Sequence, residues 1–230
     1  GYTKVLHFST LVSLMGDVVL GVRPTVHAAF QAMEKRDDAV SLTAIYNKLD
    51  RVEPQVSAAL VRDAAEQCAP AIDALHARLP PWLPGLRCRL LDGNHLSATE
   101  RRIEELRTTW AAPLPGKVLV VLDQERMLAE EVFLTEDGHA QERSLLDATL
   151  ESVRAKDLWI ADRNFCTLKF LFGIARRQGY FLIRQHGTLK GNLLGRPRKI
   201  GRSATGVVYE QVLVLIDPET DKPCQFRRLT

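Results

Sequence analysis

Two aspartates in this sequence have the type and spacing of groups that do chemistry. Asp92 and Asp162 each end an apolar run, and each is followed by turn or polar residues, Gly93-Asn94-His95 and Arg163-Asn164. In open α/β sheets, ligands bind at the carboxyl ends of the strands. Two carboxylates that meet at one sheet edge repel each other, so such a pair either raises a pKa or binds a divalent cation. The alternative for each aspartate taken alone is a turn or cap residue.

The charge distribution suggests a polyanionic partner. The 47 residues from Arg163 to Tyr209 contain ten Lys and Arg and no Asp or Glu, so a net charge of +3 leaves −7 for the other residues. Such asymmetry favours nucleic acid as the partner, and the alternative is a solvated basic surface. The phosphate-contact candidates are Arg163, Arg176, Arg177, Arg184, Lys190, Arg196, Arg198, Lys199 and Arg202.

Helices are expected before these groups. Apolar residues recur at helical spacing over residues 40–49, behind Ser41 as a cap, and over 56–68, behind Pro54. Pro80-Pro81-Trp82-Leu83-Pro84-Gly85 cannot continue a helix, so residues 1–85 form a predicted helical region. A helix from Asp38 to Arg51 could belong to a helix-turn-helix-like DNA-binding unit, with an ordinary packing helix as the alternative.

After residue 85 the spacing of the apolar residues changes from one typical of helices to one typical of strands. Strands are predicted at 87–92, 117–123, 127–134, 157–162 and 180–185, and helices at 141–154 and 168–178. Three meandering strands followed by alternating helices and strands predict an α/β sheet of mixed direction within residues 86–187. Beyond it, residues 188–230 predict a β-rich segment, with strands at 207–216 and 225–229 joined by a turn at 217–222.

Composition excludes several classes of protein. Of the 230 residues, 46% are hydrophobic and 26% charged, which is typical of a soluble globular chain and excludes disorder. No eighteen-residue apolar run exists to form a transmembrane helix, and the start lacks the pattern of a secretory signal. Four cysteines that lie far apart argue against a zinc site and fit a reducing cytoplasm. Gly1 in place of Met suggests a fragment of a longer protein.

Other polar residues fit structural roles better than catalytic ones. His95 and His139 fit surface or supporting positions near the aspartates, and Asp123 fits a hairpin turn. Ser97 and Cys166 have no histidine and acid at diagnostic spacing, which argues against nucleophilic catalysis.

Three segments carry a resemblance to a known family. Leu90-Leu91-Asp92-Gly93-Asn94-His95-Leu96, Gly138-His139-Ala140-Gln141-Glu142-Arg143 and Ile160-Ala161-Asp162-Arg163-Asn164-Phe165-Cys166 resemble the transposase DDE domain of bacterial insertion sequences, in the insertion sequence four family. The resemblance covers nearly the whole chain from Leu86 and, more loosely, the helical part before it. It implies an RNase H-like core, with Asp92 and Asp162 as the first two catalytic carboxylates and residues 188–230 as part of a β-rich insertion.

The resemblance also implies a reaction. In this family the carboxylates hold two Mg²⁺ ions, for which Mn²⁺ substitutes, and DNA strands are cleaved and transferred. The implied partner is double-stranded DNA, at transposon ends and target, with a homodimer in a synaptic complex. The implied location is the bacterial cytoplasm, associated with the nucleoid and not with a membrane.

The sequence departs from the family at the third carboxylate. The family places a Glu in the signature Tyr-x2-Arg-x3-Glu-x6-Lys after the insertion, and no stretch here fits it. Glu142 is expected to lie in the first turn of a helix, where its charge interacts favourably with the helix dipole. Glu210 is expected to lie in a strand of the insertion. Neither is therefore expected to replace the third carboxylate. The chain is therefore expected to end inside the insertion, to bind DNA and to fail to cut it at a useful rate.

Two alternatives stay open at this point. A DNA-binding remnant without catalysis would need the basic segment but not the metal. An unrelated metal phosphoesterase is disfavoured because histidine-rich ligand motifs are missing. Metal-dependent strand transfer distinguishes an active transposase from a DNA-binding remnant without catalysis.

Overall fold

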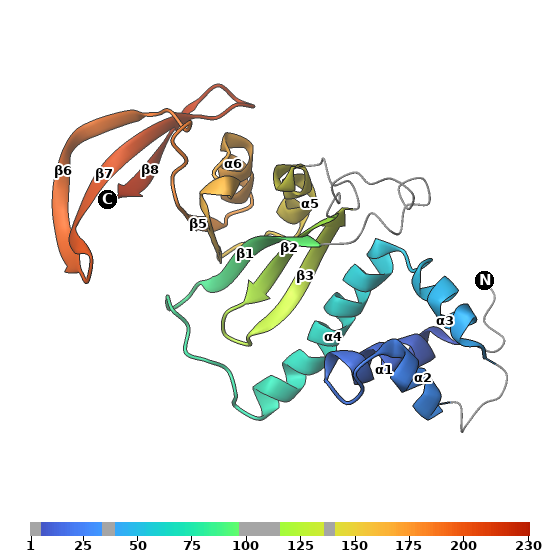
Figure 1. Cartoon of the computed structure of the whole chain (residues 1–230). Coiled ribbons are helices and arrows are strands. Elements are labelled where there is room, and N and C mark those ends of the chain that lie inside the picture. Colours follow the sequence, from blue (N-terminus) through green and yellow to red (C-terminus); the bar gives the residue numbers. More distant parts are fainter. Residues whose placement is uncertain (1–5, 34–39, 97–115, 136–140) are drawn as a thin grey trace. The chain divides into compact units, whose positions relative to one another are not determined.

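A computed structural model describes residues 6–33, 40–96, 116–135 and 141–230 (Figure 1). Its contacts divide the chain into two compact units, Gly1–Ser57 and Ala58–Thr230. The boundary predicted after Gly85 falls inside the second unit. Within the described residues, no helix combines the length and the apolar character needed to cross a membrane.

The first unit contains short helices around a small core. The helices are α1 (Phe8–Val19), α2 (Val26–Met33) and α3 (Leu42–Leu49). Ile45 of α3 is fully buried among side chains of α1 and α2. The Ser41 side chain accepts a hydrogen bond from the backbone N–H of Ala44, which confirms the predicted cap. Helix α4 (Pro54–Ala74) begins at the predicted proline, runs six residues beyond the predicted end and crosses the division between the units.

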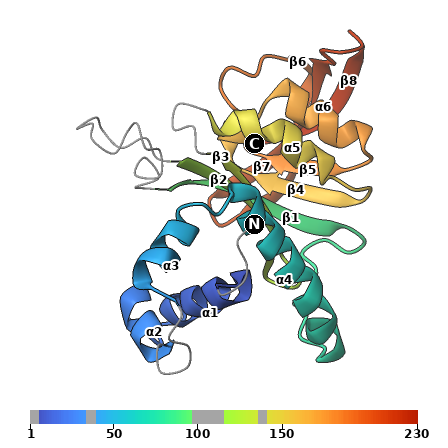
Figure 2. The ribbon, with the colours of Figure 1, turned by 90° about the vertical axis from the view of Figure 1, so that its right-hand side faces the viewer.

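The second unit contains a five-stranded sheet of mixed direction, as the sequence predicts (Figure 2). Its strands are β1 (Arg87–Leu96), β2 (Gly116–Asp123), β3 (Leu128–Thr135), β4 (Asp157–Ala161) and β5 (Tyr180–Ile183). Their order is β3-β2-β1-β4-β5. The pairs β1–β2 and β2–β3 are antiparallel, whereas β1–β4 and β4–β5 are parallel. The central strand β1 therefore joins the meander to the parallel part.

Strand β1 is longer than predicted. The prediction ended it at Asp92, but its pairing with β2 continues from Asp92 opposite Val120 to Leu96 opposite Gly116. Its parallel pairing with β4, by contrast, ends at Leu91 opposite Ala161. Asp92 is thus the first residue of β1 that β4 no longer accompanies.

The predicted helix over 141–154 is wrong in its extent. A 3₁₀ turn, η3 (Glu142–Leu145), precedes a short helix, α5 (Leu146–Glu151). The backbone N–H of Arg154 donates to Asp157 Oδ2 at 2.8 Å, so this part of the chain is bound to the start of β4 and not to a helix. The following helix, α6 (Leu168–Arg176), starts where predicted behind its Thr167 cap.

Helices α5 and α6 supply one side of the core of this unit. Trp159 of β4 and Phe170 of α6 are fully buried, with ring centroids 6.2 Å apart in an edge-to-face arrangement. Leu91 of β1 and Leu119 of β2 belong to the same cluster. The apolar positions of β1, β2 and β4 therefore hold the strands that carry the aspartates against one helical layer.

Helices α5 and α6 pack closely at Gly173 of α6 and Leu150 of α5. A Cβ on Gly173 would lie 2.6 Å from Leu150 Cδ1. Alanine is normally favoured over glycine inside a helix by about 1 kcal/mol, but an added methyl in a packed core costs about 1–3 kcal/mol. We expect Gly173→Ala to lower the free energy of unfolding by about 1–2 kcal/mol in chemical denaturation.

Gly16 in α1 provides the matched control, because a Cβ there meets nothing within 4 Å. Gly16→Ala should raise the stability of its unit by up to about 1 kcal/mol. A stabilising effect of both substitutions would contradict the close approach at Gly173.

Residues 188–230 form a three-stranded antiparallel sheet. Its strands are β6 (Asn192–Ser203), β7 (Gly206–Ile216) and β8 (Pro223–Leu229), in that order. The two later strands were predicted, whereas β6 was not, because its residues are exposed almost throughout and show no apolar alternation. Leu213 and Leu215 of β7 pack with Phe172 of α6 and anchor this sheet. We call β6, β7 and β8 the arm.

Candidate functional site

The two candidate aspartates lie on neighbouring parallel strands. Leu90 pairs with Ile160 and Leu91 with Ala161, so Asp92 and Asp162 are each the next residue beyond the shared ladder. Successive side chains on extended backbone alternate between the two faces of a sheet, and the backbone at Asp162 is still extended. Asp92 and Asp162 each lie one step beyond a paired residue, so their side chains point to the same face. Both aspartates are exposed. The structure therefore brings them side by side on one face of the sheet, just beyond the parallel β1–β4 ladder, although β1 itself continues to Leu96.

Each aspartate has one oxygen fixed by the backbone. Asp92 Oδ1 accepts from the N–H of Gly93 at 2.9 Å, and Asp162 Oδ1 accepts from the N–H of Asn164 at 2.7 Å. Across the described chain, no hydrogen bond is made to Oδ2 of either side chain. One oxygen of each carboxylate thus remains available to a cation, for which carboxylate oxygens are suitable ligands.

A complete metal centre is not assembled from these groups. Among the described residues, no three side chains of His, Cys, Asp or Glu are placed to hold a metal ion together. Asp92 and Asp162 alone would leave most of the coordination of Mg²⁺ to water and substrate oxygens, which is common for this ion.

A third carboxylate, Glu142, lies beside the pair. It starts η3, and its Oε2 accepts a hydrogen bond from Asn164 Nδ2. Its Cδ lies 2.9 Å from the position that a Cβ on Gly93 would occupy. Sequence reasoning assigned Glu142 to the first turn of a helix and missed this location. The available signals were its place in the 138–143 motif and the glycine directly after Asp92.

The structure divides the predicted phosphate contacts into two groups. Arg176 binds Asp217 at 3.0 Å and also Glu219, Arg198 binds Glu210, and Arg177 donates to the carbonyl of Gly173. Those three cations are therefore occupied by the protein. The exposed cations for which the described residues provide no partner are Arg163, Arg184, Lys190, Arg196, Lys199 and Arg202.

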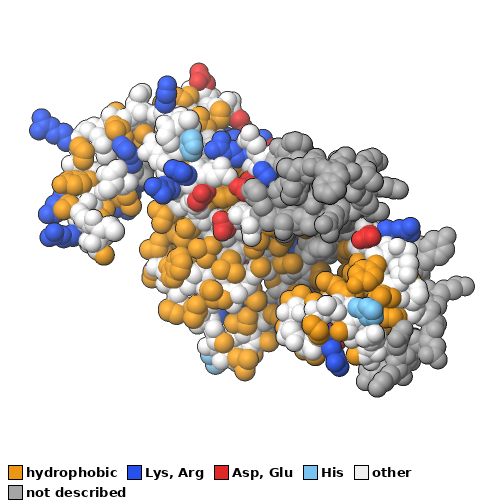
Figure 3. All heavy atoms as spheres, in the orientation of Figure 1, with side chains coloured by type: hydrophobic (Ala, Val, Ile, Leu, Met, Phe, Trp, Pro, Cys, Tyr) orange, Lys and Arg blue, Asp and Glu red, His pale blue; other side chains and the backbone are white. Residues whose placement is uncertain are grey.

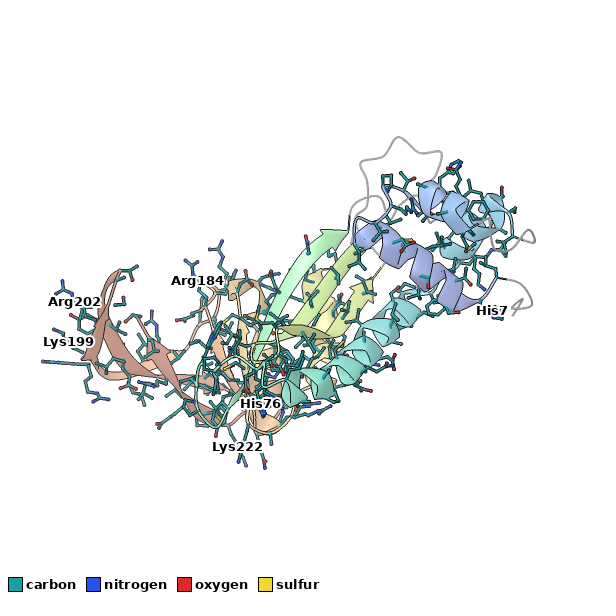
Figure 4. The ribbon with its side chains drawn as sticks, turned by 90° about the horizontal axis from the view of Figure 1, so that it is seen from below. His7, His76, Arg184, Lys199, Arg202 and Lys222 are labelled. Carbon is teal, nitrogen blue, oxygen red and sulfur yellow. The ribbon has the colours of Figure 1, made fainter. Side chains whose placement is uncertain are left out.

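Several unpaired cations lie on or near the arm. Figure 4 shows Lys199 and Arg202 on β6 and Arg184 just after β5, with side chains directed away from the ribbon. Blue Lys and Arg side chains are spread over the arm in Figure 3. Lys199 pairs with Tyr209 of β7, so the two exposed residues are cross-strand neighbours on the arm. This combination suits a phosphate backbone.

Glu210 of β7 lies between two arginines. A hydrogen bond from Arg198 and the nearby Arg227 of β8 lower the pKa of Glu210 below its ordinary value. Glu210 therefore stays charged, and its group keeps a net charge of +1. Arg227 and Arg228 were not among the sequence candidates because they lie beyond the acid-free segment.

The remaining candidates have structural roles or lie outside the described residues. Asp123 Oδ1 accepts from the backbone N–H groups of Glu125 and Arg126, which confirms the predicted turn role. Burial raises the pKa of the Cys166 thiol, which disfavours the reactive thiolate. Ser97 and His139 lie outside the described residues, and so does the side chain of His95.

Comparison of the chain with protein-family models gives no match, and comparison with curated proteins gives no relative.

Proposed function

We propose that this chain is part of a DNA transposase with an RNase H-like core, which cleaves and joins DNA strands with divalent metal bound at Asp92 and Asp162. The observation that supports this most is the position of the two aspartates, each one residue beyond the last pair of the parallel β1–β4 ladder. The carboxyl end of a parallel ladder is where α/β sheets bind ligands, although β1 itself continues to Leu96. The motifs around both aspartates resemble the same family.

The proposed roles follow from the chemistry of the side chains. Asp92 and Asp162 would hold Mg²⁺ through their free Oδ2 atoms, while Gly93 and Asn164 keep the Oδ1 atoms fixed. In such sites the bound metal lowers the pKa of an attacking water or hydroxyl and stabilises the leaving oxygen. The protein itself would orient the scissile phosphate by fixing the two carboxylates.

The unpaired cations would hold the DNA. Arg163 follows Asp162 directly, and Arg184 follows β5, whose parallel ladder with β4 ends at Ile183 opposite Ala161. Lys199 and Arg202 extend the positive charge along the arm. Contacts of this kind fix register on the duplex and carry no base specificity. We therefore expect the chain to bind double-stranded DNA of many sequences.

A DNA-binding role without catalysis is the second candidate. It is favoured by the lack of a third placed metal ligand in the described part of the chain. With only two carboxylates, we expect the chain to bind DNA and to cut it poorly.

A combined binding and cleavage assay tests the proposal. Mn²⁺ binding should be measured by calorimetry for the wild type and for Asp92→Ala, and cleavage should be followed on duplexes with candidate transposon ends in Mg²⁺ and Mn²⁺. We expect Mn²⁺ binding that needs Asp92, together with little cleavage. Equal Mn²⁺ binding by both proteins would overturn the proposal. Fast cleavage that Asp92→Ala abolishes would keep the proposal but contradict the expected low rate.

A further inference from the structure

Two consecutive residues of η3 hold the turn that follows Asp162. The Glu142 carboxylate accepts from the side-chain amide of Asn164, and Arg143 Nε donates to the backbone carbonyl of Asn164 at 2.8 Å. Asn164 is therefore bound at its side chain and at its backbone by residues 22 and 21 positions earlier in the chain.

The same carboxylate also touches the strand that carries Asp92. A Cβ built on Gly93 would lie 2.9 Å from Glu142 Cδ and 3.1 Å from Glu142 Oε1, both closer than real Cβ contacts normally come. The φ angle of Gly93 is not in the left-handed region, so its backbone does not require glycine. A side chain at this position would meet the Glu142 carboxylate and also Leu119 Cδ2, which lies 3.0 Å from the built Cβ, so one of them would have to move.

These two contacts converge on the groups that fix the aspartates. The N–H of Gly93 holds Asp92 Oδ1, and the N–H of Asn164 holds Asp162 Oδ1. We infer that Glu142 is the positioning residue that couples Asp92 to Asp162, by packing against Gly93 and binding Asn164. The inference rests on the proposed function for the metal-binding role of the aspartates, but the coupling itself needs no metal.

Hydrogen bonding distinguishes positioning from metal ligation. Glu142 Oε2 already accepts the Asn164 amide, and an acceptor is all that this contact requires. The amide oxygen of glutamine can accept the same hydrogen bond at the same side-chain length. A positioning role therefore survives Glu142→Gln and is lost in Glu142→Ala, whereas a ligand role would be lost in both.

The first test measures amide exchange by NMR without metal, on the full chain. In Glu142→Ala we expect the Asn164 N–H to exchange about tenfold faster, because its turn is released, and in Glu142→Gln we expect a rate close to wild type. The amide of Val121 in β2 serves as the folding control and should not change. An unchanged Asn164 rate in Glu142→Ala, or equal acceleration in both variants, would overturn the inference.

Gly93→Ala provides an independent arm of the test. Its Cβ would displace the flexible end of Glu142, so we expect faster Asn164 exchange. Residues that act through one contact show non-additive effects. The double variant with Glu142→Ala should therefore show no more acceleration than either single variant. Additive acceleration would contradict the coupling.

Mn²⁺ affinity separates this inference from the proposed function. Loss of an outer partner of a metal ligand typically weakens binding by about 10–100-fold, so we expect about a 10-fold loss in Glu142→Ala and little change in Glu142→Gln. A wild type that binds no Mn²⁺ but shows the expected exchange pattern would reject the metal site and keep the coupling. A loss of Mn²⁺ affinity in Glu142→Gln as large as in Glu142→Ala would show that Glu142 is a ligand and overturn the positioning role.

Discussion

Asp162→Asn should strongly weaken Mn²⁺ binding by this chain. Asparagine has the shape of aspartate and can still accept from the N–H of Asn164, so the turn should persist. The substitution removes one of two negative charges, and a hard cation prefers a charged oxygen ligand. We expect the affinity to fall by more than about 100-fold, which exceeds the usual effect of losing an outer partner. Calorimetric titration with Mn²⁺ measures this directly.

Asp147 of α5 provides the control for this experiment. It is an exposed carboxylate of the same unit, paired with Lys169 at 2.6 Å and not at the sheet edge. Asp147→Asn should leave Mn²⁺ affinity unchanged. Asp92→Asn should reproduce the loss seen at Asp162. If either aspartate could be replaced without loss, the carboxylates would not act as a pair.

The double charge reversal Lys199→Glu with Arg202→Glu should weaken DNA binding strongly. Both side chains are exposed on β6 and, in the described structure, have no acid to neutralise them. Each phosphate contact contributes about −0.9 to the slope of log affinity against log salt on duplex DNA. Loss of two contacts should therefore make the slope shallower by about 1.8, with little difference between duplexes of unrelated sequence. Fluorescence anisotropy over a salt series measures both quantities.

Lys222 allows a matched control for charge. It is exposed in the turn between β7 and β8, beside acidic residues, and the backbone N–H of Asp217 donates to its carbonyl. Lys222→Glu changes the net charge by the same amount per residue but should hardly alter the slope. A comparable change of slope in this variant would indicate a general effect of net charge, and the arm would lose its assigned role.

Short-range patterns predicted the elements that the core stabilises. The continuous apolar runs of β2 and β4 and the helical spacing of α6 were sufficient, because burial of those residues decides both their structure and their sequence. Strand β6 could not be predicted in this way. Backbone pairing with β7 holds it, and this pairing leaves no apolar pattern in its exposed residues.

In the site, too, local patterns predicted some residues, whereas others depend on contacts with distant parts of the chain. The positions of Asp92 and Asp162 followed from two apolar runs that end in acids. The location of Glu142 shows in its long-range contacts with Gly93 and Asn164, which no local pattern in the sequence encodes. Likewise, Arg176 reads as a free cation in the sequence, because its partner Asp217 lies 41 residues away.

The unequal lengths of the two ladders around β1 have a consequence for metal preference. Asp92 remains paired with Val120 of β2, whereas Asp162 has left the sheet for the η4 turn (Arg163–Phe165). Asp92 would therefore be held by strand pairing, whereas Asp162 would be held only by its turn and by the contacts of Glu142 and Arg143 with Asn164. A cation of larger ionic radius, such as Ca²⁺, would be accommodated by displacement of Asp162 while Asp92 keeps its place. The stiffness of one short turn, more than that of the sheet, would then set the range of ion sizes that the centre accepts.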